Sequence, residues 1–224
     1  MRVARLTAAA VAVAGLLAGG PARAGIIVST TGPLTINPSP AGLNLNNGNA
    51  PGSFAFNERG QVTVVAGSVS VDTLVSTLAA GLVNAKGGSA GNLPAGVYDS
   101  ALIHFDQAPG AGNPSLTASI TFSDPIVGII FSTSRLNNTD GTFGLPGVTY
   151  PTGAGGTARG LEGGDGLRIS ADRRTLFIDD WDIAGALDQT RVITLHTPAP
   201  AGAVLAVLGL PALGLLRTRR KATA

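Results

Sequence analysis

The chain contains no cysteine. Thiol catalysis and thiolate metal sites are therefore excluded, and no disulfide can cross-link the fold. Aromatic residues make up only 4% of the 224 residues, with Trp181 as the one tryptophan, and histidine occurs twice. Charged residues are also scarce, at 12%, and we find no long amphipathic helical pattern. Stability must come from burial and backbone hydrogen bonds.

The N-terminus has the pattern of a secretory signal peptide: a basic n-region, an apolar run over residues 6–18 and a small-x-small cleavage site. The basic n-region contains Arg2 and Arg5, and the cleavage site contains Ala22, Ala24 and Gly25. The pattern predicts export and removal of residues 1–24. An uncleaved anchor is the alternative, but the apolar run is short for a membrane span.

The C-terminus combines a short proline motif, an apolar stretch over residues 201–216 and a terminal basic cluster. The residues of the motif and the cluster are Pro198, Ala199, Pro200, Arg217, Arg219 and Arg220. This order resembles the PEP-CTERM sorting signal of exported bacterial proteins, with Ala199 in place of the usual glutamate. The resemblance implies recognition and processing by an exosortase in the inner membrane.

The physical properties of this segment agree with the resemblance. Sixteen residues in a helix extend about 24 Å, slightly less than the ~30 Å hydrocarbon core of a bilayer. The basic cluster is expected to stay cytoplasmic, which leaves the preceding chain outside the inner membrane. We therefore expect transient anchoring by a short transmembrane helix, then release to the cell envelope or beyond. A plain C-terminal anchor that is never processed is the alternative.

Once both end segments are set aside, the charge changes sign. The whole chain has a formal charge of +2, whereas residues 25–196 carry eight basic and 13 acidic residues, which gives −5. Because nucleic-acid binding needs a basic face, we expect no nucleic-acid partner.

The region 25–196 has the composition of a single all-β domain. Short runs rich in Val, Ile, Thr and Ser alternate with Gly, Pro, Asn and Asp turns, which is typical of a β-sandwich, and we expect a jelly-roll-like one. The predicted strands are 26–29, 53–56, 61–65, 97–105, 116–122, 126–132, 175–178 and 191–195. One helix is weakly favoured over a strand at 72–82, with Asp72 as its N-cap. The signal helix (1–24) and the sorting segment (197–224) flank this domain.

Part of this domain also resembles an extracellular domain that recurs in PEP-CTERM proteins. The stretches that carry the resemblance are 97–106, 120–122, 125–130, 145–151, 159–162 and 188–194. The resemblance implies an exported β-rich domain and implies no activity.

Two short motifs match catalytic or cofactor patterns without their context. Residues 87–91 match Gly-x-Ser-x-Gly around Ser89, but the strand and helix of a nucleophile elbow are missing. Residues 153–158 match a dinucleotide fingerprint, but no βαβ pattern surrounds them. We therefore interpret both as glycine-rich loops and expect no cofactor.

Histidine and acidic residues offer the remaining candidates. His104 lies near Asp106 in a predicted strand and is more often a structural residue there than a catalytic or metal-binding one, while His196 is expected in a linker. The acidic cluster around Trp181 offers hard oxygen ligands suited to Ca²⁺, and an exposed tryptophan beside it would suit a sugar ring. The alternative is a solvated turn with Trp181 in the core. The weak metal candidates are Asp179, Asp180 and Asp182, and Asn137, Asn138 and Asp140 form a second oxygen-rich loop.

Two classes of function remain open. The first is a non-catalytic protein of the cell envelope or extracellular matrix, associated with exopolysaccharide and biofilm and served by the export machinery and an exosortase. The second is a carbohydrate-binding protein, with or without Ca²⁺, or a glycan-cleaving one, which normally needs two carboxylates about 5–10 Å apart. A buried Trp181 favours the first class, and a cleft with facing carboxylates and an exposed Trp181 favours the second. We expect the first, and no enzyme activity.

Overall fold

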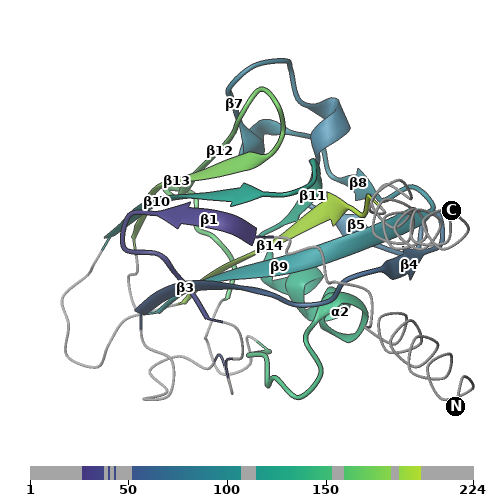
Figure 1. The fold of residues 1–224 in the computed structure, drawn as a ribbon, viewed down its shortest axis with the longest axis horizontal. Helices are drawn as coiled ribbons and strands as arrows, with labels where there is room; N and C mark the ends of the chain where they lie inside the picture. Colours follow the sequence, from purple (N-terminus) through teal and green to yellow (C-terminus); the bar gives the residue numbers. More distant parts are fainter. Residues whose placement is uncertain are drawn as a thin grey trace, which may run out of the picture.

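The structure is a computed structural model that describes residues 27–37, 40, 43, 52–106, 115–152, 159–182 and 187–197. These residues are mostly in β-strands, with one α-helix and two short 3₁₀ helices among them. The predicted all-β class is therefore confirmed. Figure 1 shows one layer of strands above another, with the α-helix below the second layer.

The upper layer in Figure 1, sheet A, is antiparallel with the strand order β1-β10-β13-β12-β7. Its strands are β1 (Ile27–Thr31), β10 (Ser115–Phe122), β13 (Thr175–Asp182), β12 (Gly166–Ile169) and β7 (Val83–Asn84). In β10 every second side chain is buried, from Leu116 to Phe122, and those between are exposed or half-buried. Sheet A therefore has one face in the core and one toward solvent.

The lower layer, sheet B, has the strand order β2-β3-β9-β14-β11-β6, and β4 also pairs with β9. Its strands are β2 (Thr35–Ile36), β3 (Gly52–Asn57), β9 (Gly96–Asp106), β14 (Asp188–Leu195), β11 (Ile126–Ile130), β6 (Thr73–Leu74) and β4 (Val62–Val64). A short ribbon pairs β5 (Ser70–Val71) with β8 (Gly91–Asn92), and the same stretch of chain holds the 3₁₀ helices η1 (Val75–Thr77) and η2 (Ala85–Gly87).

Two hydrophobic clusters hold these layers together. The first lies between the sheets and joins residues such as Ile120 of sheet A to Ile103 of sheet B. The second covers the other face of sheet B, where Leu102 and Ile193 cluster with Phe143 of the helix. The central strands β9 and β14 are consequently buried on both faces, so the polar residues within them need partners inside the protein.

The helix α2 (Thr133–Phe143) covers this second face of sheet B and was not predicted. A carboxylate from a distant segment caps its N-terminus: Asp72 Oδ2 accepts hydrogen bonds from the Phe131 and Ser132 amides at 2.8 and 2.7 Å. Arg135 in the first turn forms an ion pair with the same carboxylate. The helix predicted at 72–82 is wrong, because β6 pairs with β11 there and Asp72 caps α2 instead.

Most predicted strands are confirmed, although several of the observed strands begin or end at other residues than predicted. The strands predicted at 53–56, 97–105, 116–122, 175–178 and 191–195 lie within β3, β9, β10, β13 and β14 or coincide closely with them. The strand predicted at 126–132 ends at Ile130, because the chain turns there into α2. The preceding corner at Asp124-Pro125 joins β10 of sheet A to β11 of sheet B, so it crosses between layers and is no hairpin.

Candidate functional site

A network of three buried charged residues and one half-buried one lies between sheet B and α2. We call Glu58, Asp140, Arg159 and Arg191 the Arg191 network. The Arg191 side chain is fully buried, and Glu58 binds it in a fork, with Nε–Oε2 at 2.6 Å and Nη2–Oε1 at 2.7 Å. Its other donors reach α2 at the Leu136 carbonyl, the Thr139 hydroxyl and Asp140. All five N–H donors of the guanidinium therefore have an acceptor.

Arg159 is also fully buried and shares Asp140 with Arg191. Its Nη1 donates to Asp140 Oδ2 at 2.6 Å, and its Nε donates to the Gln189 side chain at 2.8 Å. Burial lowers the pKa of Arg159, and the Asp140 carboxylate opposes that shift. Burial alone would lower the pKa of Arg191 as well, but Glu58 outweighs it and the pKa is raised. Both arginines therefore stay charged, and two cations balance two carboxylates.

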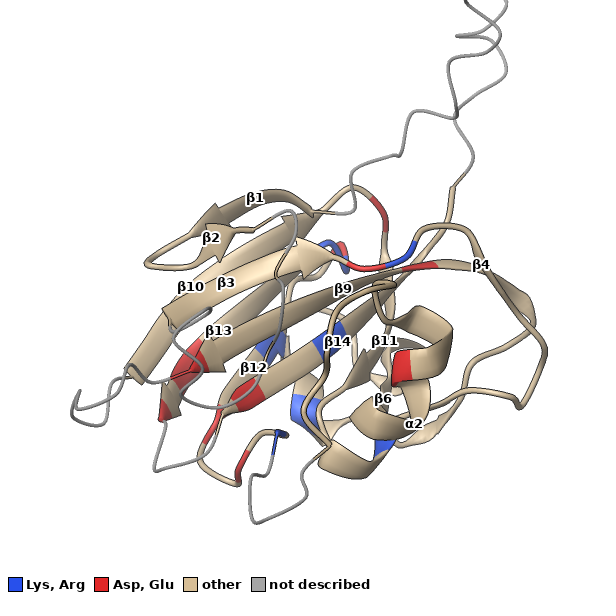
Figure 2. Cartoon of the chain, turned by 90° about the horizontal axis from the view of Figure 1, so that it is seen from below, with Lys and Arg blue, Asp and Glu red and all other residues tan. Residues whose placement is uncertain are grey.

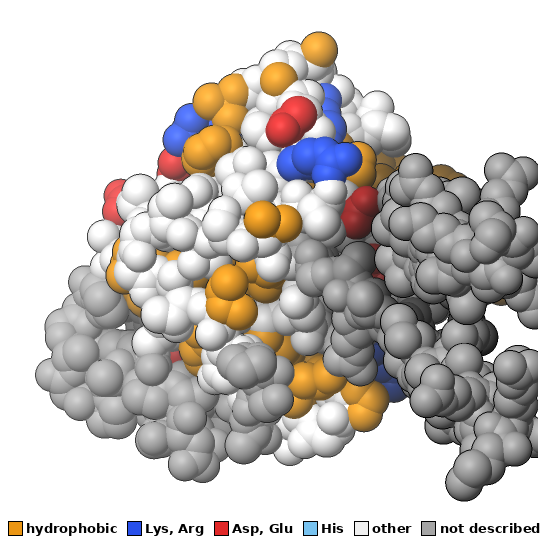
Figure 3. Space-filling view, in the orientation of Figure 1, with side chains coloured by type: hydrophobic (Ala, Val, Ile, Leu, Met, Phe, Trp, Pro, Cys, Tyr) orange, Lys and Arg blue, Asp and Glu red, His pale blue; other side chains and the backbone are white. Residues whose placement is uncertain are grey.

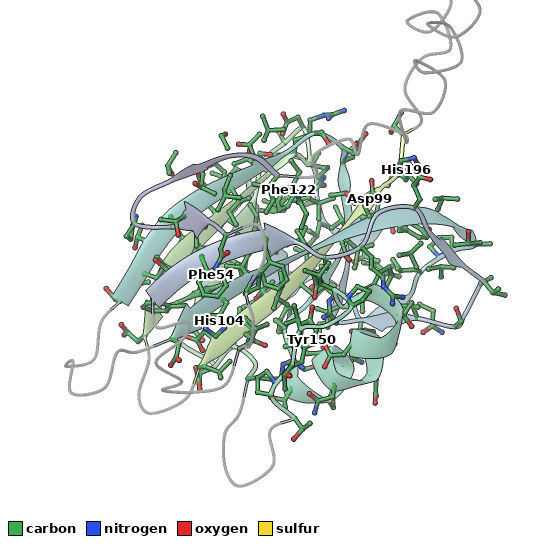
Figure 4. All side chains as sticks on the ribbon, turned by 60° about the horizontal axis from the view of Figure 1, so that its bottom comes forward. Phe54, Asp99, His104, Phe122, Tyr150 and His196 are labelled. Atoms are coloured by element: carbon green, nitrogen blue, oxygen red, sulfur yellow. The ribbon has the colours of Figure 1, made fainter. Side chains whose placement is uncertain are left out.

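Tyr150 closes the network from the loop after α2, where Figure 4 labels it. Its hydroxyl donates to Glu58 Oε1 at 2.7 Å and accepts the Leu145 amide at 2.7 Å. Its ring lies 5.4 and 5.6 Å from the guanidinium carbons of Arg159 and Arg191. Burial, followed by the charge of Glu58, raises the pKa of Tyr150. The phenol therefore keeps its proton and donates it in the hydrogen bond to Glu58. The network is internally satisfied, and its chemistry is that of a cross-link between strand, helix and loop.

The second cluster is a group of three carboxylates at the end of the sandwich, which we call the acidic group: Glu162, Asp165 and Asp188. One carboxylate oxygen from each lies within 4.8 Å of the others. Asp165 precedes β12 of sheet A, and Asp188 begins β14 of sheet B. Figure 2 shows acidic segments gathered near the ends of β12, β13 and β14. The acidic group therefore spans the two sheets.

The three carboxylates differ in exposure and in partners. Glu162 is exposed, whereas Asp165 and Asp188 are buried. Asp165 accepts the backbone amides of Glu162 and Asp182 at 2.5 and 3.2 Å. Neither oxygen of Asp188 has a hydrogen-bond partner among the described residues. Burial, followed by the charge of Asp165, raises the pKa of Asp188 to about 9, and burial likewise raises the pKa of Asp165.

The acidic residues singled out from the sequence lie nearby but do not join this group. Asp179 binds Arg168 in an exposed fork at 2.5 and 2.7 Å, and that arginine lowers the pKa of the carboxylate. Asp180 and Asp182 are exposed, and Asp182 supplies only its backbone amide to the acidic group. Within the described part of the chain, the group with three close carboxylate ligands contains none of these three candidates.

Trp181 lies between these residues and faces the core. Its side chain is completely buried, and its Nε1 donates to the Gly166 carbonyl at 3.0 Å. Of the two alternatives, the core position is therefore the one observed. The second oxygen-rich segment, at 137–140, is part of α2 rather than a loop, and Asp140 belongs to the Arg191 network.

The two histidines both have structural contacts. His104 is buried in β9, where Gln189 Nε2 donates to its Nδ1 at 2.8 Å, and its ring lies 4.8 Å from that of Phe54. Figure 4 shows His104 beside Phe54, and the pair Asp99 and His196 at the far end of β9. His196 is no free linker residue, because its amide binds the Val97 carbonyl and its Nδ1 lies 2.9 Å from Asp99 Oδ2.

Ser89 lies in an irregular segment between η2 and β8, not in a strand–turn–helix. Its backbone binds Leu74 and Thr77, with Ser89 O accepting the Leu74 amide and Ser89 N donating to Thr77 Oγ1. The nucleophile-elbow arrangement is therefore not formed. The glycine-rich motif at 153–158 lies outside the described residues.

The surface of the described residues carries scattered hydrophobic side chains. The large exposed ones are Val28, Ile36, Val65, Leu82, Val97 and Leu195, and none of these is aromatic. On the face in Figure 3 the hydrophobic side chains lie singly or in small groups among neutral ones, and most of the visible charged side chains lie in its upper half. The aromatic side chains that do reach the surface, Phe131, Tyr150 and Phe177, are half-buried.

The predicted processing signals cannot be placed in this fold. The signal-cleavage residues Ala22, Ala24 and Gly25 and the sorting residues Pro198 to Pro200 and Arg217 to Arg220 lie outside the described residues. Among the described residues, no helix has both the length and the apolar character that a membrane span requires. No protein-family model, curated protein or solved structure matches the chain.

Apart from Asp140, the residues of both clusters were missed as sites from the sequence. Arg191 lies at the edge of a predicted strand, and nothing in the local pattern shows that a helix covers it. The pair Glu162 and Asp165 does carry a signal, because two glycines separate the two carboxylates and allow a tight turn. Asp188 is 23 residues further along the chain, so only the fold brings it to that turn.

Proposed function

We propose that the chain is an exported, non-catalytic β-rich module of the cell envelope or extracellular matrix, delivered through a PEP-CTERM-like signal. The export machinery, an exosortase and, transiently, the inner membrane are its expected partners, and exopolysaccharide is the expected surrounding material. The two end segments of the sequence support the delivery route.

The observation that carries the choice between the two functional classes is the burial of Trp181. A sugar-stacking site needs an exposed aromatic ring, and this ring is instead packed between the sheets with its N–H bound to a backbone carbonyl. The charged side chains of the Arg191 network are likewise used to hold sheet, helix and loop together. Both features favour a rigid scaffold.

A glycan-cleaving protein is the weaker proposal. The acidic group does bring carboxylates together, with one oxygen of each within 4.8 Å of the others, but only Glu162 among them is exposed. Asp165 and Asp188 are also 4% and 1% exposed, which leaves no room for a sugar between them. A Ca²⁺-dependent lectin would need a binding surface elsewhere on the chain.

The test of the proposed function is the intact mass of the native protein in each cell fraction. We expect a species that spans residues 25 to about 197, with or without a modification, in the outer fractions or the medium. A full-length C-terminus found only in the inner membrane would contradict sorting and indicate a plain anchor. Retention of Met1 would contradict signal-peptide cleavage.

Two variants in the sorting motif sharpen this test. Pro200→Ala breaks the proline motif and is expected to leave the C-terminus uncut, whereas Ala199→Glu restores the residue usual in such signals and is expected to be cut at least as efficiently as the parent. Equal processing of all three chains would show that the motif is not what the processing enzyme recognises.

The finer fold assignment is also a proposal. The eight described strands of four or more residues divide evenly between the sheets, which supports a jelly-roll-like sandwich. The first and last of them, β1 and β14, lie in different sheets, so the connectivity departs from a jelly roll, in which these strands are neighbours. An experimental structure that places residues 38–51 would test the assignment.

A further inference from the structure

Two side chains hold the turn that carries Glu162 and Asp165. Lys86 in η2 donates to the backbone carbonyls of Glu162 and Asp165, at 2.5 and 2.8 Å. Trp181 holds the next residue through its bond to the Gly166 carbonyl. Lys86 is close enough for its charge to favour the ionised form of Asp188, but its ammonium is bound to carbonyls. Among the described residues, no ion pair within 4.0 Å includes any of the three carboxylates.

Asp188 provides a second and separate observation. It comes from the other sheet, is 1% exposed, and has two carboxylate oxygens without a hydrogen-bond partner among the described residues. Burial of a carboxyl group in that state favours its neutral, protonated form, and a cation that binds there would displace the proton. Its ligand atom lies within 4.8 Å of those of the Asp165 and Glu162 carboxylates.

We propose that Glu162, Asp165 and Asp188 bind one Ca²⁺ ion, which fastens the turn before β12 of sheet A to the first residue of β14 in sheet B. This inference is independent of the export route and adds a ligand to the proposed scaffold. Glu162, the exposed member, gives the ion a way in from solvent.

The ligand set selects among metals. Three carboxylates without histidine or cysteine suit a hard cation and not Zn²⁺. Two oxygens on opposite sides of Ca²⁺ are about 4.6–5.2 Å apart, which accommodates the 4.8 Å spread of the group. Two oxygens on opposite sides of Mg²⁺ are only about 4.2 Å apart, which is less than the 4.8 Å over which these ligand atoms are spread. Water and the remaining carboxylate oxygens would complete the six to eight Ca²⁺ ligands.

The first experiment is thermal unfolding and titration calorimetry of the full chain in mild detergent, freed of metal with a chelator. CaCl₂ is the probe and MgCl₂ the comparison. We expect one Ca²⁺ per chain and, at a Ca²⁺ concentration about 100 times Kd, a rise in Tm of roughly 5–10 °C. Mg²⁺ at the same concentration is expected to give a much smaller rise.

Three variants localise the site. Asp188→Asn and Glu162→Gln each remove one charged ligand and are expected to lower Ca²⁺ affinity by at least about 10-fold. In chelator, Asp188→Asn is expected to unfold no earlier than the parent, because it removes an unpartnered buried carboxylate, and exposed Glu162→Gln is expected to unfold with the parent. Asp180→Asn is the matched control: an exposed neighbouring carboxylate in a left-handed conformation (φ 52°) that asparagine also adopts.

The outcomes decide the proposal clearly. A Ca²⁺-dependent shift that both ligand variants reduce and Asp180→Asn retains supports it. Absence of any shift in the parent overturns it, as does a shift that survives in both ligand variants. An equal response to Mg²⁺ overturns the choice of Ca²⁺.

Discussion

Replacing Arg191 by lysine keeps a positive charge in the core but removes the planar fork. Arg191 makes two parallel bonds to Glu58 and three more to Asp140, a hydroxyl and a carbonyl. Lysine has three donors on a single nitrogen, so it cannot reach acceptors placed on different sides of the guanidinium.

The cost follows from the bonds that are lost. At least two of the five hydrogen bonds must break, and bonds to charged groups contribute about 1.5–3 kcal/mol each in the native state. The expected loss is about 3–5 kcal/mol in the free energy of unfolding, which agrees with the usual effect of breaking a buried ion pair. For a domain with a total stability of roughly 5–15 kcal/mol, this is a large fraction.

The assay is urea unfolding followed by the fluorescence of Trp181, the one tryptophan and a fully buried one. With a slope of roughly 2–3 kcal/mol per molar urea, the midpoint of Arg191→Lys should fall by about 1–2.5 M. Arg168→Lys is the matched control, because Arg168 makes the same fork with Asp179 on the surface and should lose less than about 1 kcal/mol. Equal midpoints for Arg191→Lys and the parent would refute the reasoning.

Three further predictions concern single positions. Gly160→Ala places a Cβ 2.3 Å from a backbone carbonyl and should cost about 1–3 kcal/mol of unfolding free energy in urea, whereas Gly163→Ala, with open space around it, should change it by less than about 0.5 kcal/mol. Asp72→Ala removes the cap of α2 and should cost at least about 1–3 kcal/mol, measured by thermal unfolding followed by circular dichroism. Acrylamide should quench Trp181 weakly in the folded protein, and efficient quenching would contradict its burial and revive a sugar-stacking role.

The strands were predictable where period-2 alternation or a continuous apolar run marks them. The strand at 116–122 alternates because one face meets solvent, and β9 is a long apolar run because both of its faces are covered. The helix α2 escaped prediction because its residues, such as Asn137, Asn138 and Gly141, have low helix propensity. Its cap and its packing against sheet B outweigh that propensity, and neither is visible locally.

The same limit explains the two clusters. Glu58 and Arg191 are 133 residues apart, and Asp188 meets the turn at Glu162 only after β12, β13 and β14 have assembled. Sequence spacing did identify an acidic stretch at 179–182, but Asp179 pairs with Arg168, and Asp180 and Asp182 are exposed and lie outside the group of three close carboxylates. Carboxylates from separate elements can converge where adjacent ones in a strand do not.

The position of β14 in sheet B has a consequence for the order of synthesis. It is the last described strand of the chain, yet it lies between β9 and β11. Until residue 195 has emerged, the 11-residue edge of β9 has no partner on that side and is exposed to wrong pairing. Folding of the sheet therefore waits for nearly the whole chain. A cut within 198–200 falls beyond the end of β14 and leaves the completed sheet intact.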